Sequence, residues 1–231
     1  MCGCQQDCSE CPIGLAKETD MKVPYQLHIT VEYKLEKGEM LEPWNRFKAA
    51  CEELGIKPLW IKNVTLDRQY LHEFITSFNM TGDDSAYNEI VDTLNNQADT
   101  LAALGFNVQR RKIETVPWHQ AVKGSMNKDQ YFETHILLNE DAPQSAWDKL
   151  TSIQADQNLH YSESIKGKSF VTFREYGTRF ERYRANLNWA LYKIRECGFT
   201  LSDKIITEFA LFDTDFHFDD KWMQREVPSI V

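Results

Sequence analysis

The strongest constraint on the fold is that this chain carries the same succession of segments twice. The first succession opens with PYQLHITVEY at 24–33 and closes with NVQRRKIETV at 107–116. The second opens with YFETHILLN at 131–139. A chain built from two similar halves often places its working site between them. His28 and His135, which occupy matching positions on the opening segments, are therefore the first candidate functional residues.

Within the first half, the residue pattern predicts the order strand, helix, strand, strand, helix, strand. Alternation of apolar and polar residues over 25–33 predicts a strand with two distinct faces. Pro43 and Trp44 open an amphipathic helix, and Gly55 ends it because glycine readily takes the left-handed conformation of a helix C-cap. The remaining elements are strands at 58–63 and 72–80, a helix from Ser85 that ends at Gly105, and a strand at 107–116.

The second half predicts the same order, with a strand at 132–138, a helix from Pro143, strands at 159–164 and 168–176, a helix from Phe180 to Ile194 and a strand at 203–212. The β-α-β-β-α-β order is that of the ferredoxin-like split β-α-β motif. We therefore expect an α+β fold, a tandem duplication of a ferredoxin-like unit whose halves each have an antiparallel sheet covered by two helices. The expected divisions are a cysteine-rich tail (1–22), a first ferredoxin-like half (23–119), a linker (120–130), a second ferredoxin-like half (131–214) and a C-terminal extension (215–231).

Charge and hydropathy argue against several classes of partner. The net charge of −9 and the pI near 5.2 disfavour duplex DNA and anionic membranes, because binding to either is favoured by a net basic surface. No apolar run reaches the roughly 20 residues that span a bilayer. The amino-terminal residues lack the basic segment and apolar core of a secretory signal, so we expect a cytoplasmic protein.

The histidine pair suggests acid–base chemistry on a phosphate. An imidazole on a strand beside a hydroxyl can donate a hydrogen bond to a phosphate while a second imidazole acts as acid or base. His28 is followed two residues later by Thr30, whereas His135 is followed two residues later by Leu137. These two motifs in similar halves resemble those of the 2H phosphoesterase and RNA-ligase-like family.

That resemblance implies an acid–base pair of His28 and His135 with a phosphate-binding hydroxyl on Thr30. The implied activity is a metal-independent phosphoesterase acting on a 2′,3′-cyclic or 2′-5′ phosphodiester of a small nucleotide or an RNA end. Among the basic residues of the two halves, we expect Arg111, Arg174 and Arg179 to bind the phosphate. The alternative is that both histidines lie on the solvent-facing side of their strands. The protein is then a non-catalytic scaffold that binds a ligand or a protein partner.

The aromatic residues Phe170, Phe173 and Tyr176 raise a second hypothesis, which is RNA binding. Ferredoxin-like sheets often bind single-stranded RNA on a face that carries aromatic residues. The usual RNA-recognition signature is missing, which favours core packing for these side chains.

Two further patterns could hold metal. Cys2, Cys4, Cys8 and Cys11 supply four thiolates within eleven residues, a set that suits structural zinc or an iron–sulfur cluster. The alternative is a free, redox-sensitive tail. Near the C-terminus, an extended LFDTDFHFDDKW segment would place acidic groups and an imidazole on one face and phenylalanines on the other. Those polar residues, Asp213, Asp215, His217 and Asp219, form either a row of ligands for Mg²⁺ or Mn²⁺ or the wet face of a terminal strand, and packing is the favoured interpretation.

Overall fold

The structure is a computed structural model that describes residues 22–32, 41–64, 70–119, 127–139, 142–154, 158–164 and 166–219. The four clustered cysteines lie outside the described residues, and the zinc or iron–sulfur site expected there stays a prediction. None of the helices in the described part of the chain is both long and apolar enough to cross a membrane.

The first half contains β1 (Val23–Glu32), α1 (Leu41–Glu53), β2 (Lys57–Val64), β3 (Tyr70–Gly82), the short 3-10 helix η2 (Asp84–Ala86), α2 (Tyr87–Ala103) and β4 (Asn107–Thr115). The second half contains β5 (Tyr131–Leu138), α4 (Gln144–Ile153), β6 (Leu159–Ser164), β7 (Ser169–Tyr176), α5 (Phe180–Glu196) and β8 (Leu201–Asp213). Gly105 and Gly198 follow the long helices α2 and α5 with φ of +85° and +105°, the left-handed region that glycine occupies without strain.

The eight strands form one closed antiparallel barrel in the order β1-β3-β2-β6-β7-β5-β8-β4. Two seams join the halves: β2 pairs with β6, where Asn63 lies opposite Ser162, and β4 pairs with β8, where Lys112 lies opposite Asp213. The expected tandem of ferredoxin-like units with separate sheets is therefore wrong. Its edge strands would expose unpaired backbone groups, and closure of the barrel pairs them across the halves instead.

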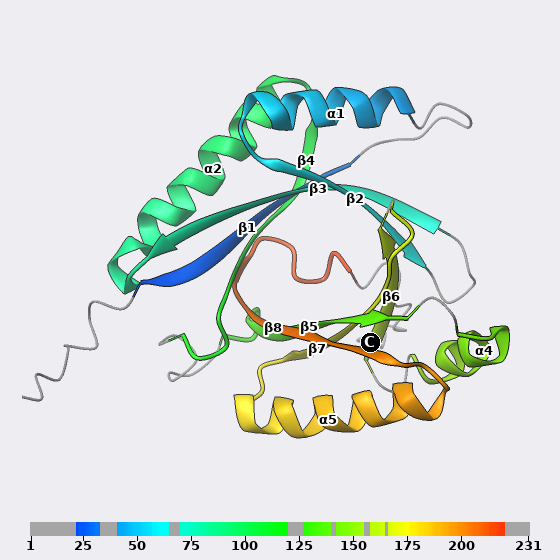
Figure 1. Ribbon diagram of the computed structural model, residues 1–231. Helices are drawn as coiled ribbons and strands as arrows, with labels where there is room; N and C mark the ends of the chain where they lie inside the picture. Colours follow the sequence, from blue (N-terminus) through cyan, green and yellow to red (C-terminus); the bar gives the residue numbers. More distant parts are fainter. Residues whose placement is uncertain are drawn as a thin grey trace, which may run out of the picture.

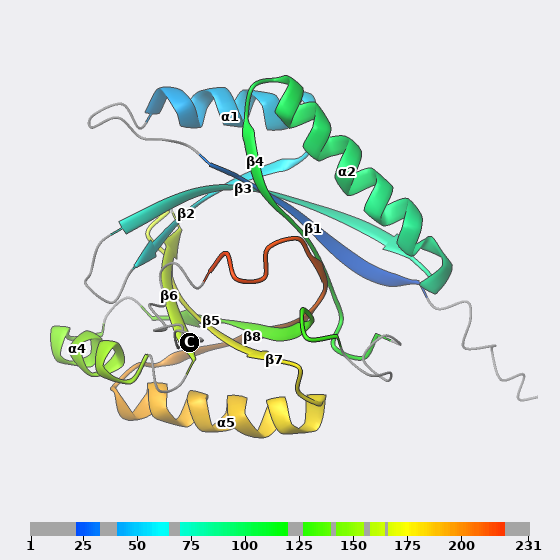
Figure 2. The ribbon, with the colours of Figure 1, turned by 180° about the vertical axis from the view of Figure 1, so that it is seen from behind.

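The helices cover only the outside of this barrel. Figures 1 and 2 show α1 and α2 along one outer side and α4 and α5 along the opposite side. Strand β1 illustrates this arrangement. Leu27 and Ile29 are fully buried towards the helices, whereas His28 and Thr30 line the barrel interior. The hydrophobic core therefore lies between the helices and the outer face of the barrel, and the inner face is left for polar groups.

Aromatic side chains form much of that outer core. The ring of Phe132, a residue of β5, lies 5.1 Å from the ring of Tyr183 and 5.2 Å from those of Phe180 and Phe209, measured between ring centroids. Phe47 of α1 stacks on Phe74 at 5.5 Å in the other half. Phe132 and Tyr183 of the second half and Phe47 of the first half have essentially no exposed surface, so each half carries its own apolar layer outside the shared barrel.

The chain enters the barrel after β8. Strand β8 ends at Asp213, and residues 214–219 form a bend and a turn rather than an extended strand. Both views show this orange-red segment inside the ring of strands (Figures 1 and 2). The single-faced row of Asp213, Asp215, His217 and Asp219 consequently does not form. Instead, Phe218 and Asp219 are buried at 8% and 3% exposure, and the segment fills part of the interior.

Candidate functional site

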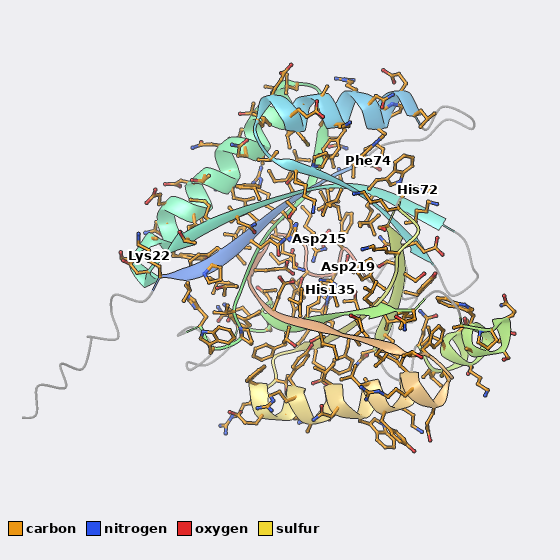
Figure 3. All side chains as sticks on the ribbon, in the orientation of Figure 1. Lys22, His72, Phe74, His135, Asp215 and Asp219 are labelled. Atoms are coloured by element: carbon orange, nitrogen blue, oxygen red, sulfur yellow. The ribbon has the colours of Figure 1, made fainter. Side chains whose placement is uncertain are left out.

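The barrel interior contains a cavity of about 460 Å³, a volume within the range of roughly 300–1,000 Å³ typical of small-molecule pockets. Part of its wall is apolar and part is charged. The apolar part consists of Leu59, Ile61, Ile75, Phe170 and Ile206. The charged and histidine-bearing part comes mainly from β1, β4, β5, β7 and β8, and Figure 3 shows His135 and Asp219 among the side chains that converge at the centre.

Lys112 on β4 connects two carboxylates in this wall. Its ammonium pairs with Glu114 on the same strand and lies 3.2 Å from Glu133 Oε1 on β5. All three side chains are at least nine-tenths buried. Burial disfavours the charge on Lys112, but Glu114 and Glu133 outweigh it and hold its pKa well above the usual range. Lys112 is therefore a fixed cation that links β4 to β5, the two strands on either side of β8 in the barrel.

Two arginines bind the C-terminal segment to the barrel. Arg110 donates from Nε to Asp213 at 2.9 Å and from Nη1 to Asp219 at 3.1 Å, and Arg174 pairs with Asp219 from the other side. Arg174 Nε also donates to Glu133 Oε2 at 2.6 Å. Burial opposes ionisation of Asp219, but Arg110 and Arg174 outweigh it and lower its pKa to about 2. Asp219 is thus an ionised anchor for residues 214–219.

His28 is held by one contact at each ring nitrogen. Its Nδ1 lies 2.9 Å from the carbonyl oxygen of Thr76 on β3, and its Nε2 lies 2.9 Å from Glu114 Oε2. Both partners are hydrogen-bond acceptors, so β3 and β4 together fix the orientation of the His28 ring.

His135 faces the cavity more openly, with 39% of its side chain accessible. Nδ1 lies 2.9 Å from the hydroxyl of Thr172, while Nε2 lies 3.1 Å from Glu133 Oε1 and 3.7 Å from Glu208 Oε2. Burial lowers the pKa of His135, but the hydrogen bond and charge of Glu133 outweigh it and the net shift is upward. Burial, reinforced by the charge of Glu114, raises the pKa of Glu208 to about 7.

One imidazole and two carboxylates come close enough to share a cation. Glu114, His135 and Glu208 each present one ligand atom, and these atoms all lie within 4.8 Å of one another. Imidazole nitrogen and carboxylate oxygen are the donors that divalent first-row metals take in proteins.

The charges of the whole cluster do not balance. Three basic side chains, Arg110, Lys112 and Arg174, face five carboxylates, Glu114, Glu133, Glu208, Asp213 and Asp219. With Glu208 ionised and both histidines neutral, the cluster carries two more negative than positive charges, and protonation of Glu208, whose pKa is about 7, or of a histidine reduces this excess. Arg110, Lys112 and Arg174 are already paired with carboxylates of the cluster, so an anion would have to displace one of these partners, whereas a cationic or neutral group would not.

The structure brings together four of the six residues expected to form a phosphoesterase site. His28, Thr30, His135 and Arg174 all line the cavity, so neither histidine lies on the outer surface. Arg111 and Arg179 lie outside the cavity lining. The Arg111 guanidinium lies 3.8 Å from Asp99 on α2, and Arg179 is exposed at the N-terminal end of α5. Of the three aromatics considered for RNA, Phe170 lines the cavity, Phe173 is buried, and Tyr176 packs on Tyr131.

Sequence reasoning missed the acidic and basic partners of the histidines. Lys112, Glu114, Glu133 and Glu208 were not selected as site residues, and Asp219 was considered only as a member of the C-terminal row of acidic residues. A signal was present on β4, where Arg110, Lys112 and Glu114 recur with the two-residue period of a strand face. A strand face bearing only charged residues looks solvent-exposed in isolation, and it becomes a site only when the barrel closes around it.

Comparison with protein-family models gives no match, and comparison with curated proteins gives none either. Among solved structures, a putative monooxygenase from Fusobacterium nucleatum is 12% identical, covers 81% of this chain and 91% of its own, and has a TM-score of 0.27. A putative monooxygenase from Lactobacillus acidophilus is 10% identical over 82% of this chain and 93% of its own, with a TM-score of 0.29. An unknown protein from Galdieria sulphuraria is 10% identical over 83% of this chain and 100% of its own, with a TM-score of 0.26. At such TM-scores these likenesses carry no argument about fold or function.

Proposed function

We propose that this protein binds a small organic molecule inside its barrel, with the apolar body of the molecule against Ile61, Ile75 and Ile206 and a cationic or neutral polar group against the carboxylates. The observation that carries this proposal is that a single cavity is lined by both apolar and charged side chains. A barrel of eight strands has an interior that is either filled by side chains or holds one small ligand, and this one retains a cavity. Burial of the apolar body would supply binding energy, and the charged groups would fix its orientation.

A polar group in the cavity wall supports this proposal. Asn63 on β2 is 1% exposed and lines the cavity, and its Nδ2 has no hydrogen-bond partner in the described part of the chain. A buried donor without a partner costs about 1–3 kcal/mol. A ligand that presents a hydrogen-bond acceptor to Asn63 would offset that cost.

The charge balance argues against a phosphodiester. The cluster already has an excess of carboxylates, and Arg174 is paired with both Glu133 and Asp219. Two of the three arginines expected to bind phosphate, Arg111 and Arg179, do not line this cavity. No comparison supports a phosphoesterase or an RNA-binding role, and neither is part of the proposal. The resemblance of the two histidine motifs to the 2H family stays a prediction from the sequence.

The proposal is tested by ligand-observed NMR with three matched fragment sets: apolar amines, neutral amides and apolar carboxylates. We expect amines and amides to bind and carboxylates to bind at least tenfold more weakly. Ile206→Trp should remove binding, because Ile206 lines the cavity and is 43% exposed, so the larger ring has space to occupy it.

The matched control is Leu104→Trp, at a residue 40% exposed that follows the outer helix α2, and it should leave binding unchanged. The proposal fails if carboxylates bind as tightly as amines, or if both tryptophan variants bind like the unmodified protein.

A further inference from the structure

We infer that Glu114, His135 and Glu208 form a binding site for one divalent first-row transition-metal ion in the cavity wall. This inference goes beyond the binding of an organic molecule, and it can hold or fail without one. The three residues come from β4, β5 and β8, which are consecutive in the barrel with β8 in the middle. Strand pairing therefore fixes the relative positions of their backbones.

The spacing suits a shared ion. Ligand atoms about 2.1 Å from one metal lie at most about 4.2 Å from each other. The three candidate atoms already lie within 4.8 Å of one another, so small rotations of the glutamate side chains would bring them to that range.

The orientation of His135 is the second supporting observation. Its Nδ1 lies 2.9 Å from Thr172 Oγ1, so Nδ1–H can donate to the hydroxyl and leave the lone pair of Nε2 for a metal. Nε2 points to the side where Glu133 and Glu208 present carboxylate oxygens at 3.1 and 3.7 Å. An imidazole nitrogen surrounded by acceptors must share a cation with them, either a proton or a metal ion.

The third supporting observation is the position of Glu208. It lines the cavity, and within the described residues its one ion-pair partner at 4.0 Å or less is His135. Glu133 and Glu114, by contrast, are each paired with Lys112. Lys112 therefore neutralises only part of the negative charge around His135, and a divalent ion would compensate the carboxylate that Lys112 does not reach.

The donor set selects the class of metal. One imidazole and two carboxylates suit Mn²⁺, Fe²⁺, Co²⁺ or Zn²⁺ better than Ca²⁺, which takes oxygen ligands only, or Cu⁺, which prefers sulfur. Three protein ligands also leave at least one coordination position free. Because all three residues line the cavity, that position would be open to a molecule bound there.

The test uses Mn²⁺ alone as the probe, measured by electron paramagnetic resonance on the full chain without any organic ligand. Mn²⁺ is chosen because the thiolates of Cys2, Cys4, Cys8 and Cys11 would compete for Zn²⁺ but bind Mn²⁺ weakly. We expect one tightly bound Mn²⁺ per chain. Glu208→Gln, which keeps the side-chain shape, should weaken binding at least tenfold, and His135→Ala should abolish it.

Two controls locate the site. His72→Ala removes a histidine whose Nδ1 accepts a hydrogen bond from Trp60 and which does not line the cavity, and it should bind Mn²⁺ normally. Replacement of the four tail cysteines by serine should also leave Mn²⁺ binding unchanged. Circular dichroism must show folded protein for every variant. The inference is overturned if the unmodified chain binds no Mn²⁺, or if folded Glu208→Gln and His135→Ala retain its affinity.

Discussion

The two faces of the barrel wall differ in what they are built to do. The outer face is apolar and packed against helices, as with Leu27, Ile29 and Phe132, none of which has measurable exposure. The inner face of the same strands carries His28, Lys112, Glu133 and other polar groups. Adjacent residues of one strand therefore serve different purposes, stability on the outside and a polar, ligand-accessible interior on the inside. Substitutions on the two faces should consequently have different effects.

The largest effect on stability should come from the outer face. Phe132→Ala should lower the free energy of unfolding by about 3–5 kcal/mol, because it leaves a cavity among three aromatic rings. Phe170→Ala, at a residue that lines the existing cavity, should cost less than half as much. Urea denaturation of both variants measures the difference. Equal losses would contradict the assignment of the core to the outer face.

The next effect tests whether the inner charges stabilise the barrel. Glu133→Gln should lower the free energy of unfolding by about 3 kcal/mol, because Lys112 and Arg174 then lose a buried carboxylate partner. Glu175→Gln, at a half-buried carboxylate hydrogen-bonded to Asn186, should cost less than about 1 kcal/mol. If Glu133→Gln is as stable as the unmodified protein by chemical denaturation, the cluster does not stabilise the fold.

The third prediction concerns the stability of the fold at acidic pH. The pKa of Asp219 is lowered to about 2 in the folded protein from an ordinary value of 3.8. Its contribution, on the order of 2 kcal/mol, is therefore fully present above about pH 4 and is lost as the pH falls towards 2. Between pH 5 and pH 2, the free energy of unfolding should fall more steeply for the unmodified protein than for Asp219→Asn. If it falls equally in both proteins, Asp219 is not the ionised anchor of residues 214–219.

The smallest expected effect distinguishes a residue that positions His135 from one that stabilises the fold. Thr172→Val removes the hydroxyl that holds Nδ1 of His135 and keeps the side-chain shape. We expect Mn²⁺ affinity to fall about tenfold, as for other residues that orient a metal-binding histidine, with a change in unfolding free energy below about 1 kcal/mol. Thr134→Val, at a buried hydroxyl that bonds Tyr183 rather than a histidine, is the control and should not change Mn²⁺ affinity. A loss of stability without a loss of affinity would assign Thr172 a structural role only.

Local features could be predicted from the sequence because their causes are local. The two-residue alternation of β1 and the glycines after α2 and α5 are written in neighbouring residues, and the observed elements lie close to the predicted ranges. The histidines of the site were also identifiable, since they occupy matching positions in the two halves. Their partners were not, because Lys112, Glu114 and Glu208 approach them only through strand pairings.

The sequence by itself determined the order of strands and helices and which alternate residues of each strand are apolar. Tertiary structure alone decided that β2 pairs with β6 and β4 with β8, and thereby that two expected sheets become one barrel. The physical reason is that a polar strand face carries the same pattern whether it meets bulk water or an enclosed cavity. Only pairing between residues far apart in the chain distinguishes the two, and it converts rows of polar residues into the charged interior of the site.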